Sequence, residues 1–247
     1  MKFLIVNDDS IDAPGIQVLA RAAAKLGEVW VAAPAEQCSA LSQKLTLREL
    51  ISVEEATDFP APVVKAWSIG GTPVDCVKVA LEYLMEEKPD VVLSGINNGF
   101  NAGQDIVYSG TLGAAFEAER QGVPAIAFSA ASDHYLDAME PYLLPLLLEL
   151  TQKRAELCSV WNVNFPAVKE TKPLRGILRD RCVCPVSMYQ ERYVPVRRED
   201  RKTWLECRGT PTPDAMIPEG TDAAAVRAGY ISIGQVGCLF DVWEENA

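Results

Sequence analysis

Apolar and polar positions alternate in blocks along the first two thirds of the chain. Short apolar runs predict buried strands at residues 2–6, 28–34, 90–95, 124–130 and 159–166. Stretches with apolar residues three or four positions apart predict helices at residues 13–27, 72–88, 111–122 and 135–157. Strands that alternate with helices imply parallel strands joined by right-handed crossovers. We therefore expect an α/β fold, a three-layer sandwich around a mostly parallel sheet.

The pattern changes beyond Pro166. Residues 167–247 contain basic and β-branched clusters such as RYVPVRRED, and only residues 221–230 look helical before a last strand at 230–236. We expect residues 1–166 to form the core and residues 167–247 to form a β-rich extension. This extension packs on the core or reaches to a partner subunit.

Composition narrows the function classes. The chain has 247 residues, 49% of them hydrophobic, which is enough for a large core. We find no apolar stretch that could cross a membrane and no signal peptide, so we expect no membrane partner. Seven irregularly spaced Cys residues fit reduced thiols and a cytoplasmic location. The net charge of −11 argues against a nucleic-acid partner, and it would repel a phosphate ester unless a cation or backbone amides reversed the field locally.

Polar side chains follow the predicted strands, and ligands of open α/β sheets bind at that edge. Asp8 and Asp9 come directly after the first strand, and Ser39 lies in the loop after the second. Adjacent carboxylates repel each other unless a cation, hydrogen bonds or protons offset the charge. The alternative is a polar turn that caps the next helix.

The third strand is followed by SGINNGFNAGQDIVYSGT, eighteen residues long, whereas such connections usually span about two to six residues. Ser109, Gly110 and Thr111 lie where the next helix begins, and unpaired amides there form a natural phosphate-binding site. Alternatively, Ser109 or Thr111 only caps that helix, and Asn97 is a turn residue. Two carboxylates, a hydroxyl and an amide oxygen at one sheet edge form an all-oxygen ligand set, which Mg²⁺ and Mn²⁺ prefer.

The motifs NDDS, AAPAEQCS, GGTPVDCVKVAL, SGINNGFNAGQDIVYSGTLGAAFEA and NVNFP occur in this order. Over residues 1–166 the chain thereby resembles the SurE survival-protein family of metal-dependent nucleoside monophosphate phosphatases. The resemblance implies a Rossmann-like core and a homodimer or homotetramer built with the extension. It also implies a cytoplasmic nucleotidase that hydrolyses nucleoside 5′-monophosphates, with 3′-monophosphates as further candidate substrates. The family's metal ligands fall on Asp8, Asp9, Ser39 and Asn97, with one Mg²⁺ or Mn²⁺ per subunit.

We expect the Asp8 and Asp9 pair to be catalytic and to hold the attacking water, with Asp8 the better candidate to orient it. Ser109, Gly110 and Thr111 are expected to hold the phosphoryl oxygens, and two further residues of the loop are candidates for substrate contact. These two are Asn101 and Asp105.

The chain departs from the family at Ser10, where the family usually has Gly. If φ is positive there, Ser10 destabilises the fold by about 1 kcal/mol and shifts Asp9 slightly. Two other readings stay open. One is a phosphatase of the haloacid dehalogenase type, although its acids are spaced D-x-D, and the other is a nucleotide-sensing regulator without turnover. We expect His134 to have a surface or capping role and Cys38 to be a small loop filler.

Overall fold

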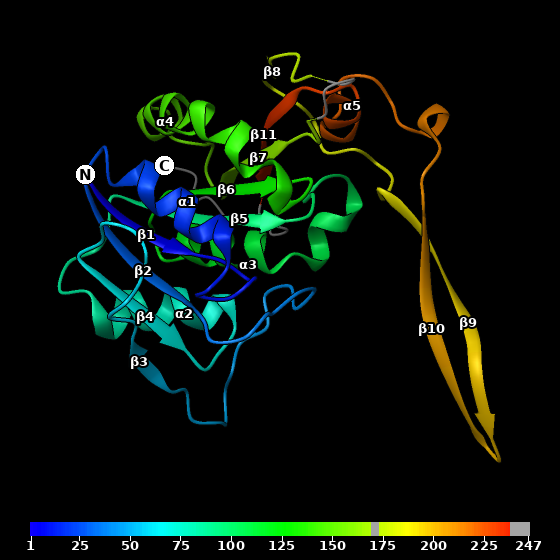
Figure 1. Cartoon of the computed structure of the whole chain (residues 1–247), viewed down its shortest axis with the longest axis horizontal. Helices are drawn as coiled ribbons and strands as arrows, with labels where there is room; N and C mark the ends of the chain where they lie inside the picture. The colour runs from blue at the N-terminus through cyan, green and yellow to red at the C-terminus, as the bar shows by residue number, and fades with distance from the viewer. Residues whose placement is uncertain (169–172, 238–247) are drawn as a thin grey trace, which may run out of the picture.

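The computed structural model describes residues 1–168 and 173–237, and its centre is a nine-stranded sheet with helices on both faces (Figure 1). The strand order is β3-β4-β2-β1-β5-β6-β7-β11-β8. The strands of the sheet are β1 (Lys2–Val6), β2 (Glu28–Pro34), β3 (Val53–Glu55), β4 (Lys65–Ile69), β5 (Val91–Asn98), β6 (Ala125–Ala130), β7 (Ser159–Phe165), β8 (Ile177–Leu178) and β11 (Ile231–Gly237). The helices are α1 (Pro14–Ala23), α2 (Pro73–Val79), α3 (Gly110–Arg120), α4 (Leu136–Gln152) and α5 (Asp222–Arg227). The predicted α/β sandwich is confirmed.

The middle of the sheet is parallel. Strand β1 pairs in parallel with β2 on one side and with β5 on the other, and β5, β6 and β7 continue the parallel order. The exceptions are β3, antiparallel to β4, and β11, antiparallel to β7. Because the central strands share one direction, the segments that follow β1, β2, β5 and β6 meet at one edge of the sheet.

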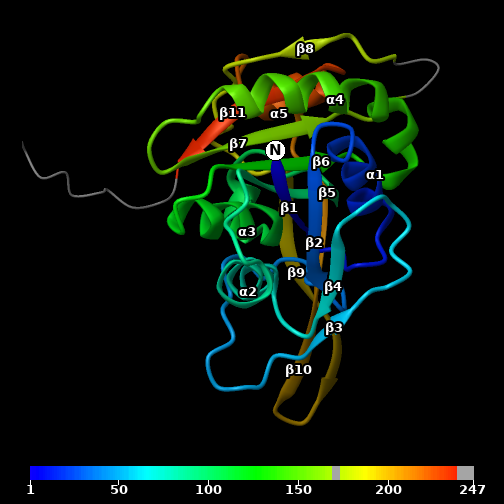
Figure 2. The same cartoon turned by 90° about the vertical axis from the view of Figure 1, so that its left-hand side faces the viewer.

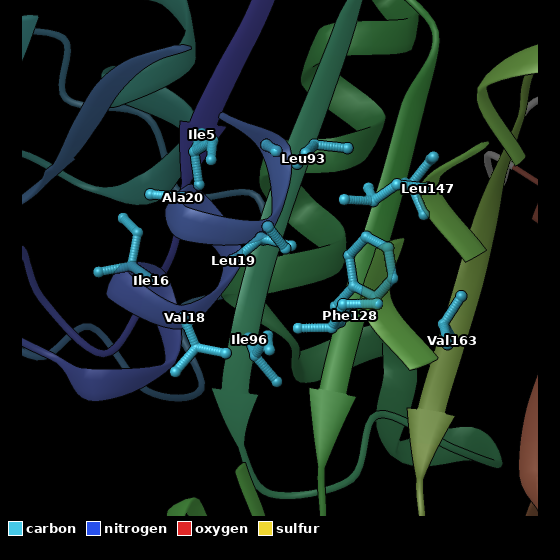
Figure 3. Close-up of a cluster of buried hydrophobic side chains, with 14 of the residues drawn as sticks. Ile5, Ile16, Val18, Leu19, Ala20, Leu93, Ile96, Phe128, Leu147 and Val163 are labelled. Atoms are coloured by element: carbon cyan, nitrogen blue, oxygen red, sulfur yellow. The ribbon is translucent and has the colours of Figure 1, made fainter. Parts of the chain in front are cut away.

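Two apolar clusters cover the two faces of the sheet. Phe3 and Ile5 of β1 belong to the cluster under α1 and α4, part of which Figure 3 shows. Leu4 and Val6 point the other way into the cluster under α2 and α3. All four are fully buried, and burying each such side chain contributes about 1.5–3 kcal/mol. Because side chains of β1 alternate between two buried faces, the register of this strand is fixed. The residues after Val6 therefore leave the sheet at a defined point.

Several predicted boundaries need correction. Helix α1 ends at Ala23, well before Gly27, and α2 gives way to a π-helical turn, η1 (Ala80–Leu84), instead of continuing to residue 88. Strands β3 and β4 were not predicted, because β3 is exposed along its whole length and carries no apolar pattern. Strand β5 extends to Asn98, so part of the long loop is strand.

The C-terminal region contributes to the sheet and also leaves it. Strand β11 pairs with β7, and β8 pairs with β11, so the sheet continues past residue 166. Strands β9 (Tyr189–Glu199) and β10 (Lys202–Pro211) pair only with each other and form a long hairpin that projects from the body (Figures 1 and 2). The predicted β-rich extension is confirmed, whereas the division at residue 166 into two domains stays a prediction.

No helix within the described ranges is long and apolar enough to cross a membrane.

Candidate active site

The turn after β1 is held in place by its own polar groups. The Asn7 side-chain Nδ2 donates a hydrogen bond of 2.7 Å to the Ser10 carbonyl oxygen. The Ile11 N–H donates to the Pro34 carbonyl oxygen at 2.9 Å, which brings this turn beside the end of β2. Ser10 has a φ of 97°. A positive φ is the condition under which Ser at this position is strained, so the Ser10 backbone is strained.

Asp8 lies buried at the start of α3, with an exposed fraction of 4%. Its Oδ1 accepts a 2.7 Å hydrogen bond from the Thr111 hydroxyl, and the Ser94 hydroxyl of β5 donates to the Thr111 carbonyl oxygen at 2.8 Å. A Cβ at Gly110 would lie 2.9 Å from Asp8 Oδ2, so only glycine allows this approach. The first turn of α3 therefore holds the Asp8 carboxylate, and β5 holds that turn through Ser94.

Burial is the main reason that the pKa of Asp8 is raised to about 6; the hydrogen bond from the Thr111 hydroxyl opposes this rise, and the negative charge of Asp9 adds to it. Burial also raises the pKa of Asp9. Among the described residues, no Lys, Arg or His forms an ion pair with either carboxylate. Within residues 1–168 and 173–237, the pair is thus a concentrated negative charge without a cationic partner.

Asp9 connects the loops that surround it. Its Oδ2 accepts a 2.8 Å hydrogen bond from the Asn98 N–H, and its Oδ1 accepts from Gln37 Nε2 at 3.4 Å. The same Gln37 nitrogen donates to the Ser39 hydroxyl at 3.1 Å. The loops after β1 and β2 and the end of β5 therefore meet at Asp9, as the topology of the sheet predicts.

Asn97 and Ser39 are the residues expected to add neutral oxygens to the carboxylate pair. Asn97 Nδ2 donates to the Gly99 carbonyl oxygen at 2.9 Å, so the side-chain oxygen is the atom available to a cation. Ser39 is exposed and is joined to Asp9 through Gln37. The described part of the chain contains no group of three or more His, Cys, Asp or Glu side chains able to hold a metal. The donor set is two carboxylates plus neutral oxygens, which fits a hard divalent cation.

The residues predicted to bind phosphate surround the first turn of α3. Ser109 is the N-cap, and its hydroxyl accepts a 3.1 Å hydrogen bond from the Leu112 N–H, so the capping role considered for Ser109 is confirmed. Thr111 is fully buried and its hydroxyl is directed at Asp8. The backbone N–H groups of Gly110 and Thr111 lie at the positive end of the helix dipole. Phosphate binding by these three residues stays a prediction.

Asn101 and Asp105 have protein partners. Asn101 is buried and its Nδ2 donates to the Ser129 hydroxyl at 2.8 Å. Asp105 Oδ2 accepts a 2.7 Å hydrogen bond from the Met188 N–H, which joins the loop to the start of the hairpin. Both contacts hold the loop in place, and direct contact with a substrate is untested.

Sequence reasoning left Gln37, Asn98 and Asp133 out of the site. The Asp133 N–H donates to Asn98 Oδ1 at 3.3 Å, and burial and the charge of Asp9 raise the pKa of its carboxyl group. Its position after β6 was the available signal, because that strand ends at the same edge as β1 and β5.

The two other residues weighed in the sequence have ordinary surroundings. His134 is exposed, and its N–H donates to the Ser132 hydroxyl at 3.4 Å, in agreement with a surface or capping role. Burial raises the pKa of the Cys38 thiol, as does the charge of Asp8, which disfavours a reactive thiolate.

Comparison with known proteins adds an independent line of evidence. The family model described as "Survival protein SurE" matches residues 3–188. The chain is 35% identical over 247 residues to "5′-nucleotidase SurE" of Flavobacterium psychrophilum, a match that covers 99% of this chain and 93% of the relative. It is 40% identical over 249 residues to the protein of the same name from Nostoc sp., covering 94% and 91%. The crystal structure of the SurE protein from Aquifex aeolicus superposes with a TM-score of 0.82 at 31% identity, covering 98% of this chain and 95% of that one.

Proposed function

This chain belongs to the survival protein SurE family, and from that premise we propose that it is a 5′-nucleotidase, which hydrolyses nucleoside 5′-monophosphates to a nucleoside and phosphate. Full-length relatives named as 5′-nucleotidases support the reaction class. The observation that carries the proposal is the buried Asp8, which lies beside Asp9 and against the first turn of α3. Carboxylates next to the first turn of a helix combine an acid pair with the positive end of the helix dipole, which favours an anion.

We propose that Asp8, Asp9, Ser39 and Asn97 hold one Mg²⁺ or Mn²⁺ per subunit. When bound, the cation neutralises phosphate charge and makes water a better nucleophile. The oxygen-only donor set supports this assignment, as does the lack of an ion pair to either carboxylate in the part of the chain that the structure describes. A bound cation also offers an explanation of how a chain with a net charge of −11 admits an anionic substrate.

The protein's own groups would then position the reaction. The Thr111 hydroxyl orients Asp8, whose carboxylate accepts hydrogen bonds from the attacking water and receives its proton. The Gly110 N–H group would donate to a phosphoryl oxygen as negative charge shifts during the displacement. Asn98 and Gln37 hold the Asp9 carboxylate in a single orientation. The bond from phosphorus to the nucleoside oxygen would break as the bond to the water oxygen forms, and the departing oxygen would take up a proton from Asp8 or from solvent to leave as the nucleoside hydroxyl.

The test is phosphate release from a panel of nucleoside 5′- and 3′-monophosphates, with Mg²⁺ or Mn²⁺ and again after treatment with EDTA. We expect release with a cation and its loss in EDTA. Absence of release from every 5′-monophosphate with both cations would overturn the proposal. Nucleotide binding without release would instead identify a sensing regulator, and a trapped phospho-aspartate would identify the dehalogenase-type mechanism.

Assembly as a homodimer or homotetramer through the C-terminal extension belongs to the same proposal. The projecting hairpin supports it, because a two-stranded hairpin is only marginally stable in water by itself.

A further inference from the structure

Strand β7 carries two buried amide side chains near its carboxyl end. Asn162 and Asn164 have exposed fractions of 3% and 0%. They lie two residues apart and therefore on one face, the face that Val160 packs against α2 and α3. Central strands of parallel sheets are normally apolar on both faces, and buried amides are unfavourable unless they are hydrogen-bonded. Their partners show what these side chains do.

Both amides bind the backbone of a single loop residue, Asn101. Asn164 Oδ1 accepts from the Asn101 N–H at 2.9 Å, and Asn164 Nδ2 donates to the Asn101 carbonyl oxygen at 3.0 Å. Asn162 Nδ2 donates to the same carbonyl oxygen at 2.9 Å, while its Oδ1 accepts from Asn164 Nδ2 at 3.3 Å. Ser129 of β6 adds a fourth anchor at the Asn101 side chain. One loop residue is thus clamped by two neighbouring strands.

The clamp lies close to the carboxylate pair along the chain. Asn101 follows Asn98 by three residues, a stretch that spans at most about 11 Å. The Asn98 N–H donates to Asp9 Oδ2, and Asn97 directly precedes Asn98 in β5. A displacement of Asn101 therefore moves the groups that orient Asp9.

We propose that Asn162 and Asn164 are positioning residues, which clamp Asn101 so that Asn97 and Asn98 stay in register with Asp9. The inference rests on the proposed function for its kinetic readout, whereas the clamp itself is open to measurement without it. Neither side chain has to touch the substrate. Their effect passes through the backbone of residues 97–101.

Two controls separate positioning from general support of the fold. Trp161→Phe removes a 2.8 Å hydrogen bond to the Lys153 carbonyl oxygen from the opposite, amino-terminal half of β7. Ser232→Ala removes a buried hydroxyl that faces Asn164 across the β7–β11 pair and has no hydrogen-bond partner within the described residues. Among the described residues, neither side chain forms a hydrogen bond with the loop.

The experiment uses the full chain with Asn162→Ala, Asn164→Ala and Ser129→Ala beside the two controls. Three quantities are measured: amide hydrogen exchange of residues 97–103 without metal, Mn²⁺ affinity by calorimetry, and kcat/KM for a nucleoside 5′-monophosphate. We expect faster exchange of the loop and losses of about 10- to 100-fold in Mn²⁺ affinity and kcat/KM for Asn164→Ala, with smaller losses for Ser129→Ala. The controls should stay within about two-fold of the wild type even where their Tm falls.

The proposal is overturned if Asn164→Ala melts earlier but keeps loop exchange, Mn²⁺ affinity and kcat/KM per folded molecule at wild-type values. If that variant does not fold, the same comparison is decided by Asn162→Ala and Ser129→Ala. If the wild type releases no phosphate, the proposed function fails, and loop exchange still decides whether the clamp positions residues 97–103.

Discussion

The carboxyl edge of the sheet and the β9–β10 hairpin break the usual distribution of side chains in opposite ways. At the sheet edge, charged and polar side chains are buried, and Asp8 is the clearest case. Along the hairpin, apolar side chains are exposed, among them Tyr193 at 69%, Leu205 at 57% and Val196 at 55%. Buried charge and exposed apolar surface are the two informative exceptions to hydrophobic burial. The first exception supports the proposed cation site, and the second supports the proposed assembly through the hairpin.

The largest effect is expected from Asp8→Asn, which keeps the size of the side chain and one carbonyl oxygen. Turnover should fall by roughly two orders of magnitude or more, because the change removes a charge from the proposed metal and water site. Stability of the metal-free protein should hold or rise, since a carboxylate that repels Asp9 has been neutralised. Phosphate release and thermal melting of the same sample measure both.

Asp75→Asn is the matched control, because Asp75 is equally buried but closes the capping box at the start of α2. It should lose about 0.5–2 kcal/mol of stability and keep its activity. If Asp8→Asn behaves like this control, destabilised and fully active, then the pair is structural.

The pH dependence of the metal-free protein should show the buried Asp8 directly. Burial raises the pKa of Asp8 in the folded state to about 6, whereas the ordinary pKa of Asp in the unfolded chain is near 4. The folded state therefore binds the proton more tightly, and the resulting stabilisation is fully present below about pH 4. That stability is lost as the pH rises through about 6. The free energy of unfolding of wild type relative to Asp8→Asn should therefore decrease by roughly 2 kcal/mol between pH 4.5 and 8.

Denaturant melts in EDTA at the two pH values measure this difference. A constant difference would show that Asp8 titrates normally and is more hydrated than its position at the start of α3 implies.

A smaller effect is expected at Ser10, whose φ of 97° strains any residue other than glycine. Ser10→Gly should stabilise the protein by roughly 0.5–1 kcal/mol, with the greater freedom of glycine in the unfolded chain offsetting part of the relief. Turnover should stay equal or increase, because Asp9 relaxes toward an unstrained turn. A lower Tm for the variant would mean that the surrounding hydrogen bonds already accommodate Ser10 without strain.

The smallest effect on the fold is expected from shortening the hairpin. Replacing residues 191–209 by Asn-Gly joins Gln190 to Thr210, a pair already opposite each other. Melting should shift by no more than about 3 °C, since neither strand contributes to the two large core clusters. Light scattering should report a smaller assembly, and an unchanged mass would remove the hairpin from the contact.

The hairpin is the right segment to shorten, because a cut at residue 166 would also remove β11. That strand pairs with β7 along six residue pairs, so its loss would damage the sheet itself.

The sequence predicts features that depend on neighbouring residues better than features that depend on distant ones. The local sequence pattern predicts strand β1 and the polar residues 7–9 that follow it. The parallel order of the strands then brings Asp9, Ser39 and Asn97 to one edge of the sheet. The capping box of Thr72 and Asp75, which the structure shows at the start of α2, is likewise a local feature, since its two residues lie three positions apart. The return of β11 to the sheet and the clamp on Asn101 depend on contacts between residues far apart in the chain, 61 to 63 positions for the clamp, which periodicity does not encode.

The most direct test of the central claim is a calorimetric titration of Mn²⁺ into the chelator-treated, full-length protein. The carboxylate pair at the edge of the sheet predicts one bound cation per chain for the wild type and much weaker binding for Asp8→Asn. Equal binding by the two proteins, or no binding by a wild type that still releases phosphate, would contradict the assignment.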